Sequence, residues 1–225
     1  MLDVVETRTE TACKALISQA LTLTQQAQVT AVALDMLKAY ANAVSDKLPQ
    51  ADIVHDRFHI SQHLNEAVDK IRRKENKALV EEGDSRLKGT KFHWLVNAEN
   101  LHEDYQENFD ILRRSELKVS RAWAIKESLR HFWDYKSAGW AKGYFERWYS
   151  WAIRSRLGPI KEKARMIKAH LPNILTYFKH GISNAVAEGL NSKIQTVKSN
   201  ARGYRSFDGF RNSILFYCGC LNMAP

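Results

Sequence analysis

The pattern of apolar and polar positions predicts an alternation of strands and helices near the start of the chain. Residues 29–34 (VTAVAL) form a β-branched and nearly continuous apolar run, which predicts a strand buried on both faces. Residues 51–56 (ADIVHD) predict a second strand. Residues 36–48 between them have helical periodicity and are followed by proline. Strand, helix and strand predict a βαβ unit with two parallel strands.

Each predicted strand is followed by, or ends in, an acidic residue. Asp35 follows the first strand and Asp56 closes the second. Parallel strands bring these ends to the same edge of a sheet, where open α/β folds place their chemistry. A simpler interpretation of Asp35 is that it caps the helix that begins at Met36.

The first residues predict two further elements. Leu2 to Glu6 has the composition of a short strand. Thr9 to Leu23 predicts a helix with Thr9 as its N-cap.

Residues 60–180 have a different pattern, in which helical periodicity dominates. Ile60 to Glu82 predicts a long basic helix, and a polar linker follows from Gly83 to Thr90. This block holds all of the tryptophans, and tryptophans at helical spacing are most often core residues. Trp140 or Trp148 could alternatively stack on nucleic-acid bases. The tryptophans are Trp94, Trp123, Trp133, Trp140, Trp148 and Trp151.

A final helix is predicted by an apolar stripe with steps of four, four and three residues, formed by Val186, Leu190, Ile194 and Val197. Another face of the same helix carries Glu188, Asn191, Gln195 and Lys198. One carboxylate among amides and cations suits a metal ligand beside a polyanion. The alternative is that Asn184 caps this helix and that the helix dipole favours Glu188 in the first turn.

Composition adds a preference for anionic partners. The chain has 225 residues, a net charge of +9 and a pI near 9.5, which favours a nucleic acid but is also compatible with a membrane surface or simple solubility. No apolar run approaches the ~18 residues of a membrane span, and no signal-peptide pattern opens the chain. We therefore expect a cytoplasmic protein.

Cysteine and histidine spacing argues against a metal-binding or disulfide framework. The three cysteines form no CxxC pair, so we expect reduced, structural residues at Cys13, Cys218 and Cys220. His55, His59 and His63 would share a helix face and could suggest zinc. Because residues 51–56 read as a strand, His55 and His63 should lie on different elements, which disfavours a three-histidine site.

Four segments occur in an order that is typical of a known family. They are residues 32–36 (VALDM), 49–59 (PQADIVHDRFH), 184–194 (NAVAEGLNSKI) and 202–211 (RGYRSFDGFR). In this order they resemble the DDE transposases of bacterial insertion sequences, and specifically the group called ISL-three, whose hallmark is an Asp-Arg-Phe-His strand end. The resemblance extends over essentially the whole chain.

The resemblance implies a helix-dominated α/β protein with a partial RNase H-like fold and a large all-helical insertion. Residues 1–59 would form a partial RNase H-like core, and residues 60–180 the tryptophan-rich helical insertion. Residues 181–225 would supply the catalytic helix and a basic tail that return to the core.

In that family three carboxylates hold two Mg²⁺ ions, which activate the nucleophile and stabilise the leaving oxygen during attack on DNA phosphodiesters. The resemblance makes Asp35 the second of these acids and Glu188 the third, both as metal ligands. Asp56 remains an alternative for the second acid. Otherwise Asp56 and His59 would support the site, together with Asn184 and Asn191, although His59 could also be an ordinary core histidine.

The resemblance also implies DNA as a partner, at the ends of an insertion sequence. The basic residues expected to contact it are Arg57, Lys193, Lys198, Arg202 and Arg205.

The chain departs from the family at the first catalytic acid. Residues 2–10 resemble the third strand and the following helix of the family fold, so Asp3 does not match the first acid. We therefore expect a truncated transposase that is inactive alone, with a second copy or a full-length transposase as partner. The alternative function is a non-catalytic basic protein that binds DNA or a transposase and regulates it.

Overall fold

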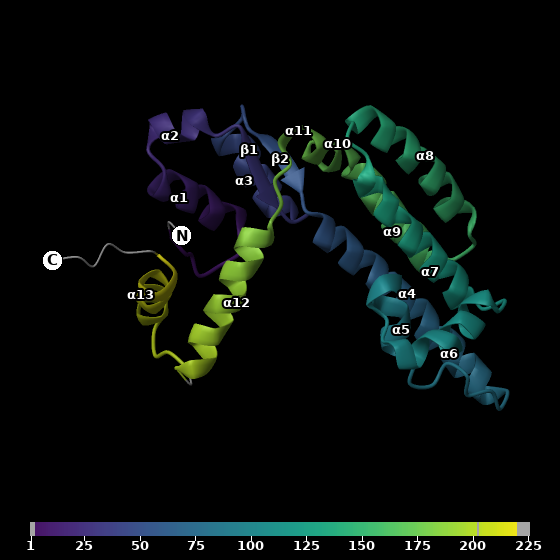
Figure 1. Cartoon of the computed structure of the whole chain (residues 1–225). Coiled ribbons are helices and arrows are strands. Elements are labelled where there is room, and N and C mark those ends of the chain that lie inside the picture. Colours follow the sequence, from purple (N-terminus) through teal and green to yellow (C-terminus); the bar gives the residue numbers. More distant parts are fainter. Residues whose placement is uncertain (1–2, 202, 220–225) are drawn as a thin grey trace. The chain divides into compact units, whose positions relative to one another are not determined.

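The structure is a computed structural model that describes residues 3–201 and 203–219 (Figure 1). It is helix-dominated with a small parallel sheet, as an α/β protein should be. The described residues form two compact units: the chain up to Asp56 together with the chain from His180 onward, and the intervening residues 57–179.

The sheet of the first unit is the predicted βαβ element. Strands β1 (Ala31–Leu34) and β2 (Asp52–His55) are parallel, and α3 (Lys38–Lys47) connects them. The prediction that the first strand is buried on both faces was wrong, because only Leu34 of β1 is buried. In the described part of the chain the sheet has two strands, so its core is small and gathers around Leu34, Val44, Leu48 and Ile53.

Two helices precede the sheet where one was predicted. Helix α1 (Glu10–Ala20) begins at its predicted N-cap, since the Thr9 hydroxyl accepts a hydrogen bond from the Ala12 N–H. Helix α2 (Leu23–Gln28) starts separately because Thr22 and Gln25 form a capping box.

The strand predicted for Leu2 to Glu6 is not formed by residues 3–6, and Leu2 lies outside the described residues. A strand needs a partner for its backbone groups, whereas this segment is held through a side chain. The Asp3 carboxylate accepts a hydrogen bond of 2.8 Å from Arg211 on α13 (Phe207–Cys218). This ion pair ties the start of the chain to its last described helix.

The predicted C-terminal helix is α12 (Ala185–Asn200). Its apolar stripe is partly covered, since Leu190, Ile194 and Val197 are half-buried while Val186 is 77% exposed. None of the residues of α12 is fully buried. The position of α12 in its unit therefore depends on contacts at its ends as well as on packing.

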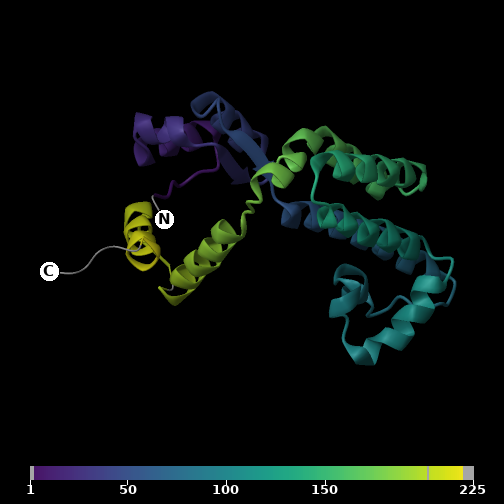
Figure 2. The ribbon, with the colours of Figure 1, turned by 45° about the horizontal axis from the view of Figure 1, so that its top comes forward.

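The second unit is entirely helical and is built on α4 (Arg57–Glu81), which packs against α7 (Lys118–Leu129) and α9 (Gly158–Ala169) (Figure 2). Helix α4 begins at Arg57, one residue after the end of β2 and three residues before the predicted Ile60, so Arg57 and His59 are helical. The predicted polar linker is confirmed, since residues 83–90 contain no helix or strand. The remaining elements are α5 (Lys91–Leu95), η1 (Ala98–Asn100), α6 (Glu103–Arg114), η2 (Arg130–Asp134), α8 (Ala138–Arg154), α10 (Leu171–Leu175) and α11 (Tyr177–His180), of which the last residue belongs to the first unit.

Tryptophans form much of the core of the second unit, as predicted. Trp94, Trp123 and Trp148 are buried, and Phe109 makes edge-to-face contacts with the first two. The Trp148 indole donates a hydrogen bond to the Ile125 carbonyl, so Trp148 is not available to stack on bases. Trp140 differs, because 75% of its surface is exposed.

A buried lysine and a carboxylate cap helix ends in this unit. The Lys126 ammonium donates hydrogen bonds to the carbonyls of Trp94, Leu95 and Val96 at the end of α5. Burial lowers the pKa of Lys126 to about 8. At the start of α7, the Glu75 carboxylate accepts hydrogen bonds from the backbone of residues 118 and 119.

Cys13 and Cys218 are free thiols, as predicted, whereas Cys220 lies outside the described residues. None of the described helices is long and apolar enough to cross a membrane.

Candidate metal and nucleic-acid site

Asp56 lies where β2 ends and is 4% exposed. Its Oδ2 accepts a hydrogen bond of 2.8 Å from the backbone N–H of Asn184, which is the residue before α12. Helix N-termini present backbone N–H groups that have no partner within the helix and that attract carboxylates. Asp56 therefore fixes the start of α12 against the end of β2.

Glu188 lies in the first turn of α12, at the end of the helix that is bonded to Asp56. Its backbone N–H bonds to the Asn184 carbonyl at 2.9 Å, so the turn is regular helix from its first bond. The Glu188 Oε1 is buried and has no hydrogen-bond partner among residues 3–201 and 203–219. A buried carboxylate oxygen without a donor is costly unless a cation or proton satisfies it.

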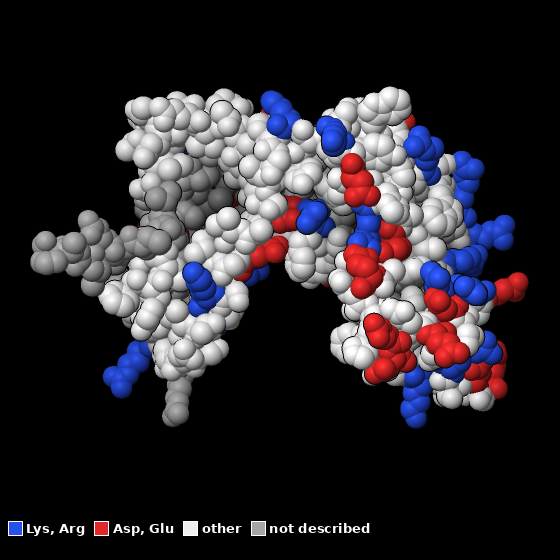
Figure 3. Space-filling model, in the orientation of Figure 1, with Lys and Arg blue, Asp and Glu red and all other residues white. Residues whose placement is uncertain are grey.

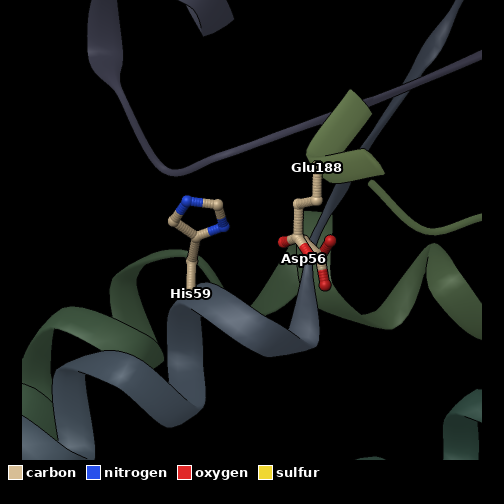
Figure 4. A group of neighbouring side chains, drawn as sticks. All are labelled: Asp56, His59 and Glu188. Atoms are coloured by element: carbon tan, nitrogen blue, oxygen red, sulfur yellow. The ribbon is translucent and has the colours of Figure 1, made fainter. Parts of the chain in front are cut away.

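Asp56 and Glu188 are parts of the same compact unit, and their carboxylates approach one another (Figure 4). His59 follows Asp56 by one helical turn along the chain, in the first turn of α4. Within the first unit, one carboxylate oxygen of Asp56 and one of Glu188 lie within 4.8 Å of each other. Within the described chain, the Nδ1 atom of His59 is also buried and without a hydrogen-bond partner.

The donor set fits a divalent cation. The carboxylate oxygens of Asp56 and Glu188 suit Mg²⁺ and Mn²⁺. Asp56 follows β2 and Glu188 lies in the first turn of α12, and the bond from the Asn184 N–H to Asp56 already joins these two places. The distance between the two carboxylates is therefore set by the backbone as well as by the side chains.

Asp35 occupies the neighbouring strand end. The register pairs Leu34 with His55, so Asp35 follows β1 at the level at which Asp56 follows β2. Its Oδ1 accepts a hydrogen bond of 2.9 Å from the Leu37 N–H and forms a local turn. Leu37, and not Asp35, occupies the N-cap position of α3, so the capping interpretation of Asp35 was wrong. Asp35 is half-buried.

Asn184 occupies the N-cap position of α12 but makes no capping hydrogen bond with its side chain. The expected cap is replaced by the bond from its backbone to Asp56. Asn191 is exposed on the second turn.

The predicted basic residues that the structure describes are exposed. Lys193 and Lys198 lie on α12 and Arg205 follows it, while Arg57 begins α4 in the other unit. Figure 3 shows lysine and arginine side chains along α12. Arg202 lies outside the described residues.

The three-histidine zinc site is not formed in the described chain. His55 is on β2 and is 1% exposed, whereas His59 and His63 are on α4. His63 instead neighbours Glu66 and Lys163.

Sequence reasoning missed a second contact of β2 with the segment before α12. The His180 Nε2 lies 2.7 Å from the Asp52 Oδ2. The two residues are 128 positions apart, the same separation as Asp56 and Asn184, and no local pattern signals such a pair.

Comparison with known proteins agrees with this arrangement of motifs. A family model described as transposase, for the ISL3 group of DDE enzymes, matches residues 1–214. The chain is 28% identical over 186 residues to the transposase for insertion sequence element IS1001 of Bordetella parapertussis, covering 81% of this chain and 46% of that protein. It is 30% identical over 214 residues to the transposase for insertion sequence element IS1557 of Mycobacterium tuberculosis, covering 85% of this chain and 48% of that protein.

The chain thus spans about half the length of the curated relatives it matches. No solved structure matches it. Because the family model covers nearly the entire sequence, the chain belongs to the ISL3 group of the DDE transposases.

Proposed function

We propose that this chain forms the part of a DNA transposase that carries the last acid of a metal-dependent site for phosphodiester cleavage and strand transfer. One observation carries the proposal: the carboxylates of Asp56 and Glu188 converge within 4.8 Å, and Glu188 Oε1 is buried without a partner in the described chain. Family membership and this geometry together support the proposal.

The proposed cofactor is Mg²⁺. A bound divalent ion would polarise the phosphodiester and stabilise the charge that develops on the attacking and leaving oxygens. Glu188 would hold this ion from the first turn of α12, with Asp56 beside it. His59, which lies on α4, stays a prediction from the family resemblance. Asp56 would also keep α12 in place through the Asn184 N–H.

Asp35 remains in the proposal as the second family acid. Asp35 and Asp56 follow adjacent parallel strands in register, so both carboxyl groups start from the same edge of the sheet. We propose that Asp35 is the second acid that binds the ion, because the backbone hydrogen bond of Asp56 holds the start of α12, whereas that of Asp35 is confined to its own turn. Asp56 would then be a supporting ligand.

We further propose that the chain binds the DNA of insertion-sequence ends through its exposed cations, among them Lys193, Lys198 and Arg205. Phosphate contacts of this kind position a duplex without reading its sequence.

This chain is proposed to be inactive alone, because none of its family motifs supplies the first acid. The test is strand transfer on a labelled duplex that carries insertion-sequence ends, in Mg²⁺ buffer. We expect binding without cleavage. Mg²⁺-dependent transfer that Asp35→Ala abolishes would show instead that another residue completes the site. DNA binding that persists while divalent ions do not bind at all would favour the regulatory function.

The metal site itself is tested by Mn²⁺ binding to the full chain, measured by electron paramagnetic resonance of the free ion. Glu188→Gln and Asp35→Asn should each lower the affinity by about tenfold or more, since each removes a charged ligand. Asp46→Asn is the matched control, because Asp46 is an exposed acid of the same unit that pairs with Lys14. Equal affinities for all four proteins would overturn the proposed site.

A further inference from the structure

The segment between α11 and α12 contacts β2 at two points. Asp52 opens β2 and contacts His180, whereas Asp56 follows β2 and accepts the Asn184 N–H. Each contact involves an acid at one end of β2, and both contacts are short, at 2.7 and 2.8 Å. We call these two contacts the 180–184 clamp.

The spacing of the clamp matches the geometry of a strand. Residues four apart on an extended chain point to the same side and are separated by about 13 Å. His180 and Asn184 are also four residues apart, so the segment follows β2 in the same direction. Gly181 has a φ of +64°, a conformation that L residues rarely adopt, and it lets the chain turn directly after His180.

One contact alone would leave the segment free to pivot. If Asn184 were held and His180 were free, residues 181–184 could rotate about the Asp56 hydrogen bond. Helix α12 has no fully buried residue to resist that rotation. The first turn, which carries Glu188, would then move relative to Asp56.

We propose that His180 and Asp52 are positioning residues that fix Glu188 for metal binding, through the 180–184 clamp. This inference rests on the proposed function, in that Glu188 is taken as a metal ligand. The pair does not touch the ion. It acts by holding the start of α12, as outer partners of metal sites orient the ligands.

The experiment measures Mn²⁺ affinity of the full chain by electron paramagnetic resonance, together with hydrogen exchange of the backbone amides of residues 181–188. His180→Ala and Asp52→Ala should each lower Mn²⁺ affinity by about tenfold, because misplaced outer partners cost about 10–100-fold in metal affinity. The amides of the segment should exchange faster in both variants. His180→Gln should restore most of the affinity, since its side-chain amide can still donate to Asp52.

Gln50→Ala is the matched control. The Gln50 amide donates to the carbonyls of Gln26 and Val29, so it is another long-range tether of the same unit that does not touch residues 180–184. Its loss should leave the Mn²⁺ affinity unchanged even if it lowers thermal stability. Asp52→Asn is the conservative partner of Asp52→Ala: its asparagine oxygen can still accept from His180, so the Mn²⁺ affinity should be retained.

The outcomes separate the two proposals. A fall in affinity with Glu188→Gln but not with His180→Ala or Asp52→Ala would overturn the positioning role and leave the metal site intact. No change with Glu188→Gln would overturn the metal site, and with it the stated role of the clamp. A fall in affinity with Gln50→Ala equal to that with His180→Ala would also overturn the role, because it would show a general loss of stability.

Discussion

The carboxylate of Asp56 accepts a hydrogen bond from the backbone N–H of Asn184, 128 positions further along the chain. This bond joins the end of a buried strand to the start of the helix that carries Glu188. It gives Asp56 two separable properties: a negative charge beside Glu188 and an acceptor for the start of α12.

Substitution of Asp56 should separate these two properties. Asp56→Asn removes the charge but keeps an oxygen that can accept the Asn184 N–H. Asp56→Ala removes both. We expect the asparagine variant to lose Mn²⁺ affinity while the Asn184 amide keeps its protection from hydrogen exchange. The alanine variant should lose both, with an additional cost of about 1–3 kcal/mol in the free energy of unfolding. Equal protection of Asn184 in both variants would contradict a capping role for Asp56.

Removal of a DNA-contacting cation should reduce the salt dependence of binding. Lys193→Ala, Lys198→Ala and Arg205→Ala should each lower the slope of log affinity against log salt by about one, because one fewer counterion is released. Sequence preference should not change, since phosphate contacts carry no sequence information. Lys14→Ala is the control, because Lys14 is already paired with Glu10 and Asp46. A salt titration by filter binding gives the slopes, and slopes equal to that of the unmodified chain would leave these cations as ordinary surface residues.

The tryptophans of the helical unit should differ sharply in their contribution to stability. Trp148→Ala should lower the free energy of unfolding by about 3–5 kcal/mol, because it empties a buried site and breaks the bond to the Ile125 carbonyl. Trp140→Ala should change it by less than about 0.5 kcal/mol, since the indole is 75% exposed. Urea unfolding of the two variants makes the comparison. A large loss with Trp140→Ala would show that this side chain is packed in solution.

Lys126 should make the stability of the chain rise with pH in the alkaline range. Its folded pKa of about 8 is below the ordinary lysine pKa of 10.5, so between these values the unfolded state binds more protons than the folded state. The folded state favours the neutral Lys126 amine, and this contribution to the free energy of unfolding is fully present above pH 10.5 and is lost as the pH falls towards 8. The size of this effect is at most about 3 kcal/mol.

Lys126→Met is the comparison that isolates this effect. Urea midpoints measured at pH 8 and pH 10 should show a smaller rise for the variant than for the unmodified chain. The variant also leaves three carbonyls at the end of α5 without their donor, so its stability should be lower at both pH values. A rise of the same size in both proteins would assign the pH effect to other groups.

Local sequence patterns determined the elements of this protein. The apolar run before Asp35 predicted β1, the periodicity after it predicted α3, and Thr9 marked the start of α1. These features depend on residues that are close in sequence, through caps, side-chain spacing and turn chemistry. The same local reasoning predicted a strand at residues 2–6 that the structure lacks, because a strand also needs a partner that composition cannot specify.

The motifs around Asp35, Asp56 and Glu188 identified the family, and their order along the chain was readable without any structure. The tertiary structure alone decided that Asp56 holds Asn184, that His180 meets Asp52, and that Glu188 faces Asp56. Each of these relationships joins residues more than a hundred positions apart. They form because the chain from residue 180 onward returns to β2. Neither the spacing nor the type of nearby residues encodes that return.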